Sequence, residues 1–389
     1  MISFPTKLSS IYERLEAIDP IKYGTTRNYS DGALTYLSPY ISRGVISTKI
    51  VFEFILKAHY APKEIESFLQ ELAWRDYWQQ VWKHKKATIN WDIRHAQEDV
   101  AHNQIPKAIL NGSTGIEVID TGLEQLFSAG YMHNHLRMYT AAIVCNLGKS
   151  HWLRPAQWMY YHLLDGDWAS NALSWQWVAG TNASKKYYAN QQNINKYFYS
   201  NQRHTFLDLD YPDLVNRSCP AHLFETQHPN LNTQLPKTSS LRINPNLSTL
   251  IYNYYNLDPL WRSDANHNRI LLLEPSIFEL YPVAPKSIDF ILALGKNIEA
   301  LQIYVGEFDT LKKSYDLVDI IYKEHPLNDH YVGLKEPRDW MFEVEGYFLP
   351  FLPFGKNAKS SCHERQSAHQ SCLAQKRYSH GRPCGIGRC

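Results

Sequence analysis

The sequence predicts a mainly α protein that carries a small α/β domain toward its C-terminal end. Apolar residues recur at helical spacing in three stretches, 8–18, 48–90 and 114–148. Over 266–355, apolar strand-like runs alternate with helical segments, a pattern typical of a small open unit with parallel strands. With 389 residues, 44% of them hydrophobic, the chain is long enough for two domains with a sizeable core.

Composition and charge exclude several classes of protein. The formal net charge is only +2, so any contact with nucleic acid must come from a local basic patch. No apolar run approaches the roughly 18 residues of a membrane span, and the N-terminus lacks the apolar region of a signal peptide. No membrane contact is therefore expected. Cys145 and Cys219 are isolated, which indicates a cytoplasmic protein without a disulfide framework.

The chain divides by composition into four segments. We expect a helical domain over residues 1–220, a linker rich in Asn, Pro, Ser and Thr over 221–265, and the α/β domain over 266–355. Residues 356–389 cannot form a packed core and are expected to be a disordered tail or a cloning remnant, with a basic nucleic-acid-binding tail as an alternative. The four cysteines of this tail do not match tight zinc spacing, so no metal is predicted.

Two local patterns in the first domain indicate possible ligand contacts. In a predicted loop over 21–47, Ser38 and Pro39 can begin a helix with Ser38 as its cap, and the free N–H groups of a helix start suit a phosphate, although most such starts bind nothing. Further on, four residues share one broad helix face: Glu71, Trp74, Arg75 and Trp78. Taken alone, this face is most simply an amphipathic helix whose Trp residues pack in the core.

The stretch from Thr114 to Trp177 holds three motifs: MHNHLRM at 132–138, LLDGDWASN at 163–171 and WQW at 175–177. MHNHLRM lies in the middle of the predicted helix, where polar Asn134 and Arg137 need partners because an unpaired buried polar group costs about 1–3 kcal/mol. Asp165 and Asp167 fit a helix cap or a metal-binding pair. A metal is disfavoured because no third ligand follows at suitable spacing.

Together with ELAWRDYW at 71–78 and YLSPYISRGVIS at 36–47, these motifs resemble the flavin-binding helical domain of the cryptochrome/photolyase family. The resemblance covers about residues 20–190 and implies a photolyase-like helical domain that binds FAD. In that family an antenna-binding α/β domain precedes the helical domain, whereas this chain begins almost at the helical domain. The C-terminal α/β unit either replaces the missing domain or serves for packing or partner binding.

The resemblance also implies the residues of the FAD site. Tyr23 and Arg27 match a Tyr-x3-Arg pair that holds the pyrophosphate, while Leu34 departs from the hydroxyl residue of the neighbouring motif. We expect Arg137 to pair with Asp165. The complete implied set is Tyr23, Thr35, Leu37, Ser38, Arg75, Asn134, Arg137, Asp165, Asp167 and Asn171, the last of which faces flavin N5.

For function, the resemblance implies light-dependent repair of cyclobutane pyrimidine dimers in DNA, by electron transfer from excited reduced flavin. Asn134 and Met138 agree with cyclobutane-dimer enzymes, because the (6-4) branch has His at both positions. His135 departs from the Arg that usually faces DNA there. The residues expected to face the lesion or DNA are Arg27, Glu71, Trp74, Met138 and Trp177.

Photolyase-like proteins reduce their flavin through a chain of Trp residues, in which Trp175 matches the proximal member and Trp152 the middle one. The region of the outer member reads around Asp99 and has no Trp, so Trp91, Trp158 or a Tyr residue are alternatives. The residues expected to take part in the photochemistry or the repair step are Glu71, Trp152, Asn171 and Trp175.

Two other functions stay open at this point. One is a cryptochrome-like blue-light photoreceptor that binds FAD without repair, which His135, the missing leading domain and the divergent segment 178–200 favour. Asn171, Glu71 and Met138 favour repair instead. The other alternative is a helical flavoprotein or DNA-binding module that has lost photochemistry.

Overall fold

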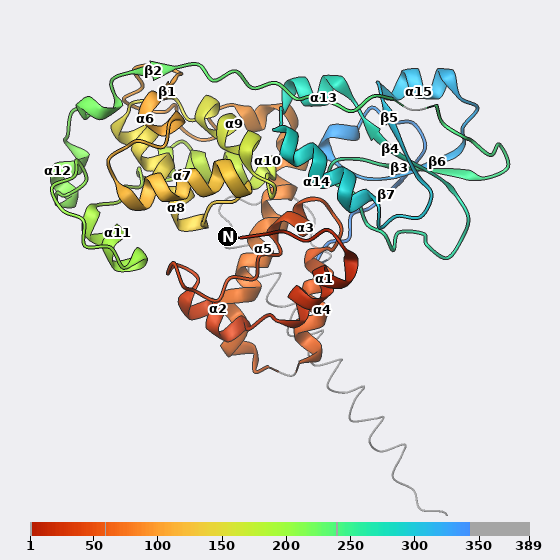
Figure 1. Ribbon diagram of the computed structural model, residues 1–389, viewed down its shortest axis with the longest axis horizontal. Coiled ribbons are helices and arrows are strands. Elements are labelled where there is room, and N and C mark those ends of the chain that lie inside the picture. The colour runs from red at the N-terminus through yellow and green to blue at the C-terminus, as the bar shows by residue number, and fades with distance from the viewer. Residues whose placement is uncertain (1, 59, 239, 343–389) are drawn as a thin grey trace, which may run out of the picture.

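The structure, a computed structural model, describes residues 2–58, 60–238 and 240–342. Its first part is helical, as the sequence predicts, and occupies the left and the bottom of Figure 1. The helices of this part are α1 (Leu8–Glu16), α2 (Pro20–Thr26), α3 (Ser38–Ser42), α4 (Thr48–Lys57), α5 (Pro62–Lys85), α6 (Lys107–Leu110), α7 (Glu117–Ala129), α8 (Asn134–Ala142), α9 (Leu153–His162), α10 (Trp168–Ala179), α11 (Gln191–Phe198) and α12 (Tyr211–Val215). Two short strands, β1 (Ile105–Pro106) and β2 (Thr226–Gln227), pair antiparallel.

The second part is an α/β unit at the upper right of Figure 1. Its sheet has the order β5-β4-β3-β6-β7, and every pair of neighbouring strands is parallel. The elements are β3 (Ser248–Tyr252), β4 (Asn268–Leu273), α13 (Pro275–Leu280), α14 (Pro285–Gly295), β5 (Leu301–Val305), α15 (Phe308–Ser314), β6 (Val318–Lys323) and β7 (Leu334–Glu336). The predicted fold class, a helical domain followed by a small parallel α/β domain, is confirmed.

The predicted linker over 221–265 is wrong in its extent, because β3 lies inside it and forms the middle of the sheet. Leu250 and Ile251 are fully buried there. The strand reads STLIY, a short apolar run of the kind that a strand covered on both faces requires. The described residues between β2 and β3 form no helix or strand, as a linker would. The predictions for residues 343–389 lie outside the described residues.

The predicted helix over 114–148 is wrong in its middle, where the chain breaks between α7 and α8. Gly130 ends α7 in the left-handed region at φ 67°, and a Cβ there would lie 2.7 Å from Leu164 Cγ. His133 then begins α8, with its Nδ1 accepting a hydrogen bond from the backbone N–H of His135 at 3.2 Å. MHNHLRM therefore starts a helix, so Asn134 and Arg137 lie in its first turns.

The predicted loop over 21–47 contains most of α2, which the Asp19 side chain caps by accepting from the backbone N–H of Lys22 at 2.9 Å. Ser38 is the first residue of α3 and does not cap it, since Leu37 holds the capping position. The Ser38 hydroxyl points instead toward a distant segment, which is described below. The sequence located this helix start correctly and misassigned the role of its serine.

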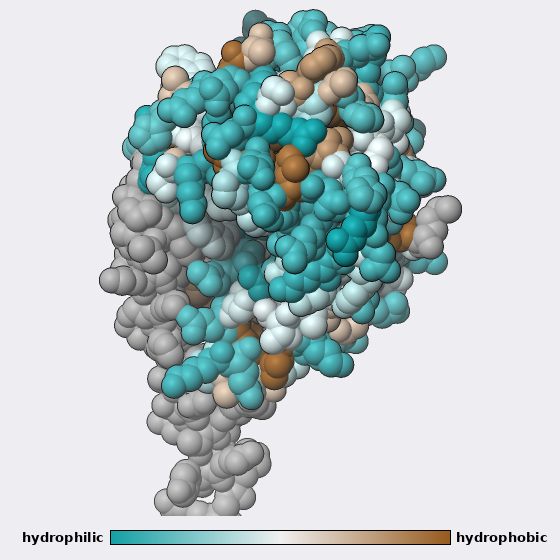
Figure 2. All heavy atoms as spheres, turned by 90° about the vertical axis from the view of Figure 1, so that its left-hand side faces the viewer, coloured by the Kyte–Doolittle hydropathy of each residue, from teal (hydrophilic) through white to brown (hydrophobic). Residues whose placement is uncertain are grey.

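The helical part is built around α5, which runs down the middle of Figure 1 and packs against α2, α4 and α10. Contacts between Arg43, after α3, and the segment after β3 join the two parts. The backbone N–H of Leu257 donates to the Arg43 carbonyl at 2.9 Å, and the Arg43 guanidinium lies 3.7 Å from the Tyr254 ring centre. Figure 2 looks onto the left-hand side of Figure 1 and shows a largely hydrophilic face with scattered apolar residues. Among the described residues, no helix is long and apolar enough to cross a bilayer.

Candidate functional site

The carboxylate of Asp165 is the centre of a polar network that joins three separate segments. Two hydrogen bonds reach it from Arg137 Nη2 on α8, at 3.0 and 2.9 Å. Ser38 Oγ on α3 donates a third at 2.7 Å. Asp165 is 6% exposed and lies between α9 and α10, so the network is enclosed by the helices that position it. The expected pair of Arg137 and Asp165 is present.

The network keeps Asp165 charged. Burial pushes the pKa of Asp165 upward, but the Arg137 guanidinium and the Ser38 hydrogen bond outweigh burial and hold that pKa below its usual value. Asp167, two residues on, caps α10 by accepting from the backbone N–H of Ser170 at 2.8 Å. The helix-cap interpretation of Asp167 is therefore the one that the structure supports, and Asp167 also accepts from the side-chain amide of Gln79.

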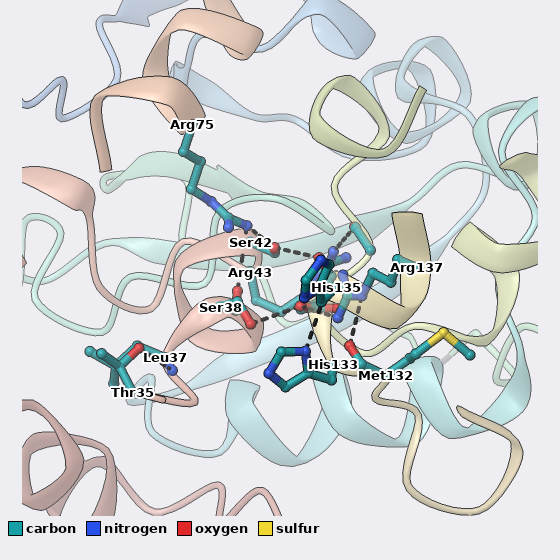
Figure 3. Close-up of polar contacts among 12 residues, drawn as sticks. Thr35, Leu37, Ser38, Ser42, Arg43, Arg75, Met132, His133, His135 and Arg137 are labelled. Carbon is teal, nitrogen blue, oxygen red and sulfur yellow. Dashed lines mark hydrogen bonds and ion pairs between the residues drawn. The ribbon is translucent and has the colours of Figure 1, made fainter. Parts of the chain in front are cut away.

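Arg75 reaches α3 from the facing helix α5 and contacts it through neutral oxygens. Its guanidinium donates to the Ser42 hydroxyl and, at 3.5 Å, to the Ser38 carbonyl (Figure 3). Ser42 Oγ in turn donates to the backbone carbonyl of Asp165 at 2.7 Å. No carboxylate among the described residues forms an ion pair with Arg75, so this half-buried cation lies close to the Asp165 network without a direct anionic partner.

Sequence reasoning missed three members of this site: Ser42, Arg43 and Gln79. Ser42 follows Ser38 by four residues, and Gln79 follows Arg75 by four, so both lie on the same helix face as a predicted residue. That spacing could have identified them. Arg43 is fully buried and donates to the carbonyls of Gly166 and Tyr254, contacts that no local pattern reveals.

Arg27 and Glu71 form a second cluster, apart from the contacts of Asp165. Arg27 Nη2 lies 3.1 Å from Glu71 Oε1, and Arg27 Nη1 donates to Ser67 Oγ at 2.9 Å. Burial raises the pKa of Glu71, and the adjacent Arg27 partly offsets that increase. The Tyr23 ring packs edge-on against Phe68 at 5.1 Å. The charge of Arg27 is thus committed to a carboxylate, while its expected contact with a pyrophosphate or DNA stays a prediction.

The expected lesion-facing aromatic residues differ in exposure. Trp177 on α10 is 41% exposed, and its ring lies 5.4 Å from that of Tyr187. Trp74 on α5 is partly buried, with its ring centre 4.8 Å from that of Trp78. Met138 is partly buried as well. Of these three side chains, that of Trp177 is the most exposed and therefore the most available to a planar ligand.

The polar residues of α8 do not all need an added ligand. Arg137 is satisfied by Asp165 and by the Met132 carbonyl, to which its Nε donates at 2.8 Å, and Asn134 is exposed. Their polarity in an apolar segment is therefore weaker evidence for a flavin than the sequence suggested. Asn171 is buried, and its Nδ2 donates to the Ala156 carbonyl at 2.8 Å.

His135 is buried against aromatic rings, so it does not present a cation to the surface. Its ring centre lies 4.4 Å from that of Tyr139 and 4.7 Å from that of Tyr197. Burial lowers the pKa of His135, which keeps the ring neutral near neutral pH. Burial likewise lowers the pKa of the neighbouring His133 to about 4.

The two matched members of the Trp chain are both buried. Trp152 is 0% exposed and Trp175 on α10 is 2% exposed. Of the alternatives for an outer member, Trp158 is also buried, at 2%, whereas Trp91 is 69% exposed. Only Trp91 of these four has the exposure of a residue that could exchange electrons with solvent.

A cavity of about 590 Å³ adjoins this region. It lies between the segment before α3, one side of α7, and residues 198–201 at the end of α11. The buried His133 borders it, and His133 Nε2 has no hydrogen-bond partner. Thr35 and Leu37 flank cavity-lining residues, but none of the predicted site residues lines this cavity. Within the described ranges, no group of His, Cys, Asp and Glu side chains could hold a metal ion.

The donor set around Arg75 suits a diphosphate-bearing cofactor. An unpaired guanidinium beside two serine hydroxyls is a chemical match for phosphate oxygens, because Arg forms strong charge-assisted hydrogen bonds with them. Of the predicted residues, the structure joins Ser38, Arg137 and Asp165 directly and brings Arg75 to the same helix. Within the described part of the chain, the Thr35 hydroxyl has a hydrogen bond only inside its own turn, where it accepts from the Leu37 backbone N–H at 3.3 Å.

Comparison with known proteins agrees with this chemistry. Residues 68–205 match the family of the FAD binding domain of DNA photolyase. The chain is 34% identical over 160 residues to a deoxyribodipyrimidine photo-lyase of Alkalihalophilus pseudofirmus, a match that covers 38% of this chain and 32% of that protein. It is 32% identical over 181 residues to the corresponding protein of Agrobacterium fabrum, covering 43% and 38%.

Among solved structures, a bacterial class III photolyase from Agrobacterium tumefaciens is 28% identical, with 44% of this chain and 37% of that chain covered and a TM-score of 0.36. The residues that match the family of the FAD binding domain, 68–205, lie in the helical part of the chain. The chain spans about a third of the length of the curated relatives named above, 32% and 38%.

Proposed function

We propose that this protein binds FAD and uses light to repair cyclobutane pyrimidine dimers in DNA. The reason is that its helical part matches proteins of the cryptochrome/photolyase family. The observation that carries this proposal is the network of Ser38, Arg75, Arg137 and Asp165. It places one unpaired guanidinium and one paired guanidinium among helices of the part that matches an FAD binding domain. The chain thereby offers both an anion site and a fixed polar edge.

The residues of the network would divide the work of holding FAD. Arg75, with the hydroxyls of Ser38 and Ser42, would bind the diphosphate. Arg137, fixed by Asp165, would present its remaining N–H groups to the ring system. When bound and reduced, FAD supplies the light-excited electron that splits a pyrimidine dimer, so no general base or protein nucleophile is required.

The lesion would be bound by aromatic and carboxylate groups. An extruded base stacks well on an exposed indole, and the Trp177 ring is the exposed one among the predicted contacts. Glu71, held by Arg27 at 3.1 Å, can accept a hydrogen bond from a pyrimidine N–H. Met138 and Trp74 would supply further apolar contact, and Asn134 is exposed and free to turn toward a ligand.

The test is a light-versus-dark repair assay. Protein reduced chemically without oxygen is mixed with an oligonucleotide that carries a thymine dimer, and the recovery of pyrimidine absorbance is followed. We expect recovery only in light, and Trp177→Ala should weaken binding of the damaged strand by about tenfold, since a base–aromatic stack contributes about 1–3 kcal/mol. Trp91→Ala removes an indole that is more exposed, at 69%, and serves as the matched control.

A cryptochrome-like photoreceptor without repair is the second candidate, and the burial of His135 favours it. Dimer-repairing enzymes of this family usually have an Arg facing DNA at that position, whereas His135 is neutral and packed on Tyr rings. Protein whose visible spectrum shows bound flavin, yet which restores no pyrimidine absorbance in light, would favour the photoreceptor over repair. A spectrum without flavin after reconstitution with FAD would refute both.

A further inference from the structure

A partly buried hydrogen bond joins the indole of Trp152 to a carboxylate from a distant segment. Trp152 is 0% exposed, and its Nε1 donates to Asp92 Oδ1 at 2.7 Å across 60 residues of sequence. Gln97 adds a second tie, because its side-chain oxygen accepts from the Trp152 backbone N–H at 2.9 Å. The indole is therefore held in place at both its backbone and its ring nitrogen.

Asp92 has two further polar partners, one on each carboxylate oxygen. Its Oδ2 accepts from the backbone N–H of Gln97 at 2.8 Å, and His151 Nε2 lies 3.2 Å from Oδ1. Both Asp92 and His151 are partly exposed, at 21% and 29% of their side chains. Asp92 thus links the fully buried indole to groups that reach solvent.

The chemistry of indole gives this contact a consequence. Neutral indole is a hydrogen-bond donor and a very weak acid, but an indole that has lost one electron is a far stronger acid. A cation left on a buried ring is costly unless it is paired or neutralised. At Trp152 the N–H already points to a carboxylate at hydrogen-bond distance, so the oxidised ring can be neutralised by one short proton movement.

We propose that Asp92 accepts the indole proton when Trp152 is oxidised, and that this proton transfer ends the electron-transfer chain at Trp152. The proposal rests on the proposed function, in which the photo-excited flavin is the electron acceptor and Trp175 the relay. One electron leaves Trp152 toward Trp175, and the Nε1 proton moves to Asp92 Oδ1. The products are a neutral indolyl radical and a carboxylic acid, and recombination reverses both transfers.

This assignment accounts for the lack of a Trp at the outer position of the chain. An exposed outer Trp would normally disperse the positive charge into solvent. Here Trp158 is buried against Phe127 and His162, at ring-centre distances of 6.1 and 5.7 Å. Trp91 is exposed and adjacent to Asp92 in sequence, so it is the Trp that the test must separate from Asp92.

The experiment is light-minus-dark infrared and transient visible spectroscopy on the FAD-loaded full chain. Wild type should show a transient carboxylic-acid C=O band and the spectrum of a neutral indolyl radical. Asp92→Asn keeps an oxygen that accepts from the indole but cannot take its proton. It should lose the acid band, show the indole cation radical, and recombine about tenfold faster or more, in line with the effect of removing a positioned base.

Two control variants complete the design. Asp99→Asn removes an exposed carboxylate paired with Lys186 at 2.9 Å and should leave the acid band and the recombination rate unchanged. Trp91→Phe should also leave both unchanged. Melting curves of all variants verify folding, and Asp92→Glu, which retains a carboxylate, should restore the acid band in case Asp92→Asn is poorly folded.

The results separate this inference from the proposed function. Repair by chemically reduced protein does not need Trp152, so Asp92→Asn should repair dimers at the wild-type rate when reduced in advance. Repair without any acid band in wild type would overturn the inference and leave the function standing. An acid band without repair would support the inference and count against repair. If Trp91→Phe loses charge separation while Asp92→Asn keeps the wild-type signal, the terminal role belongs to Trp91 and the inference is overturned.

Discussion

Replacing Asp165 with asparagine removes the charge that balances Arg137 inside the helical part. Asp165 accepts two hydrogen bonds from Arg137, at 3.0 and 2.9 Å, and one from Ser38 at 2.7 Å. Removing one partner of a buried ion pair costs about 3–5 kcal/mol, because the other charge stays behind without compensation. The Arg137 side chain is 19% exposed, so partial hydration places the expected cost of Asp165→Asn at the low end, about 3 kcal/mol.

The assay is urea unfolding followed by Trp fluorescence, with the variants Asp165→Asn, Arg137→Met and both together. The double variant has no orphan charge, so it should cost less than the sum of the single variants by about 1–3 kcal/mol. Lys107 and Glu225 form an exposed pair at 3.2 Å and provide the control. Removing Lys107 should change the free energy of unfolding by less than about 0.5 kcal/mol, as for most surface pairs.

The same pair also predicts a dependence on pH. Because the folded chain holds the pKa of Asp165 below its usual value, the stabilisation by Asp165 is present above the carboxyl pKa of the unfolded chain. It is lost as the pH falls below about 4 and through the depressed folded value. Wild type should therefore lose more stability on acidification than Asp165→Asn. Additive single costs together with parallel pH profiles would refute the assignment of Asp165 and Arg137 as a buried ion pair.

Three further predictions concern the cofactor, a buried acid and the misassigned strand. Arg75→Gln should weaken FAD retention about tenfold or more, measured by flavin fluorescence released on dilution, whereas the exposed Arg154→Gln should not. Burial raises the pKa of Asp76 to about 6, so the stabilisation by Asp76 is full below about pH 4 and is lost as the pH rises through 6. In urea unfolding over that pH range, the free energy of unfolding of wild type should fall by about 2–3 kcal/mol relative to Asp76→Asn. In the same measurement, Ile251→Ala should cost about 2–4 kcal/mol, whereas Leu260→Ala should cost less than about 0.5 kcal/mol because Leu260 is 55% exposed. The order of the two costs would be reversed if β3 were a solvated linker.

Local sequence patterns predicted the elements whose signals are complete within one segment. Ile11 and Leu15 recur at helical spacing and are buried on α1. The apolar run over 269–278 contains most of the buried strand β4, although its last four residues begin α13. In these cases the periodicity of apolar side chains matches the geometry of one element, so no knowledge of its neighbours is needed.

Where two local signals competed, the sequence was ambiguous and the prediction followed the wrong one. Gly130 could be a tolerated residue within a helix or its end, and the close approach of Leu164, 34 residues away, decides for the end. The strand β3 was hidden among turn-forming residues, and its buried position between β4 and β6 makes its apolar run decisive. Tertiary contacts selected the structure in both cases.

By itself, then, the sequence determined the helical and α/β parts, the motifs of the site, and the complementary charges of Arg137 and Asp165. Only the tertiary structure decided which of those charges are already paired. It commits Arg27 to Glu71 and leaves Arg75 among neutral oxygens, and it brings the Trp152 indole to Asp92. The physical reason is that periodicity is a property of one segment, whereas an ion pair or a hydrogen bond depends on the distance between two segments that only packing brings together.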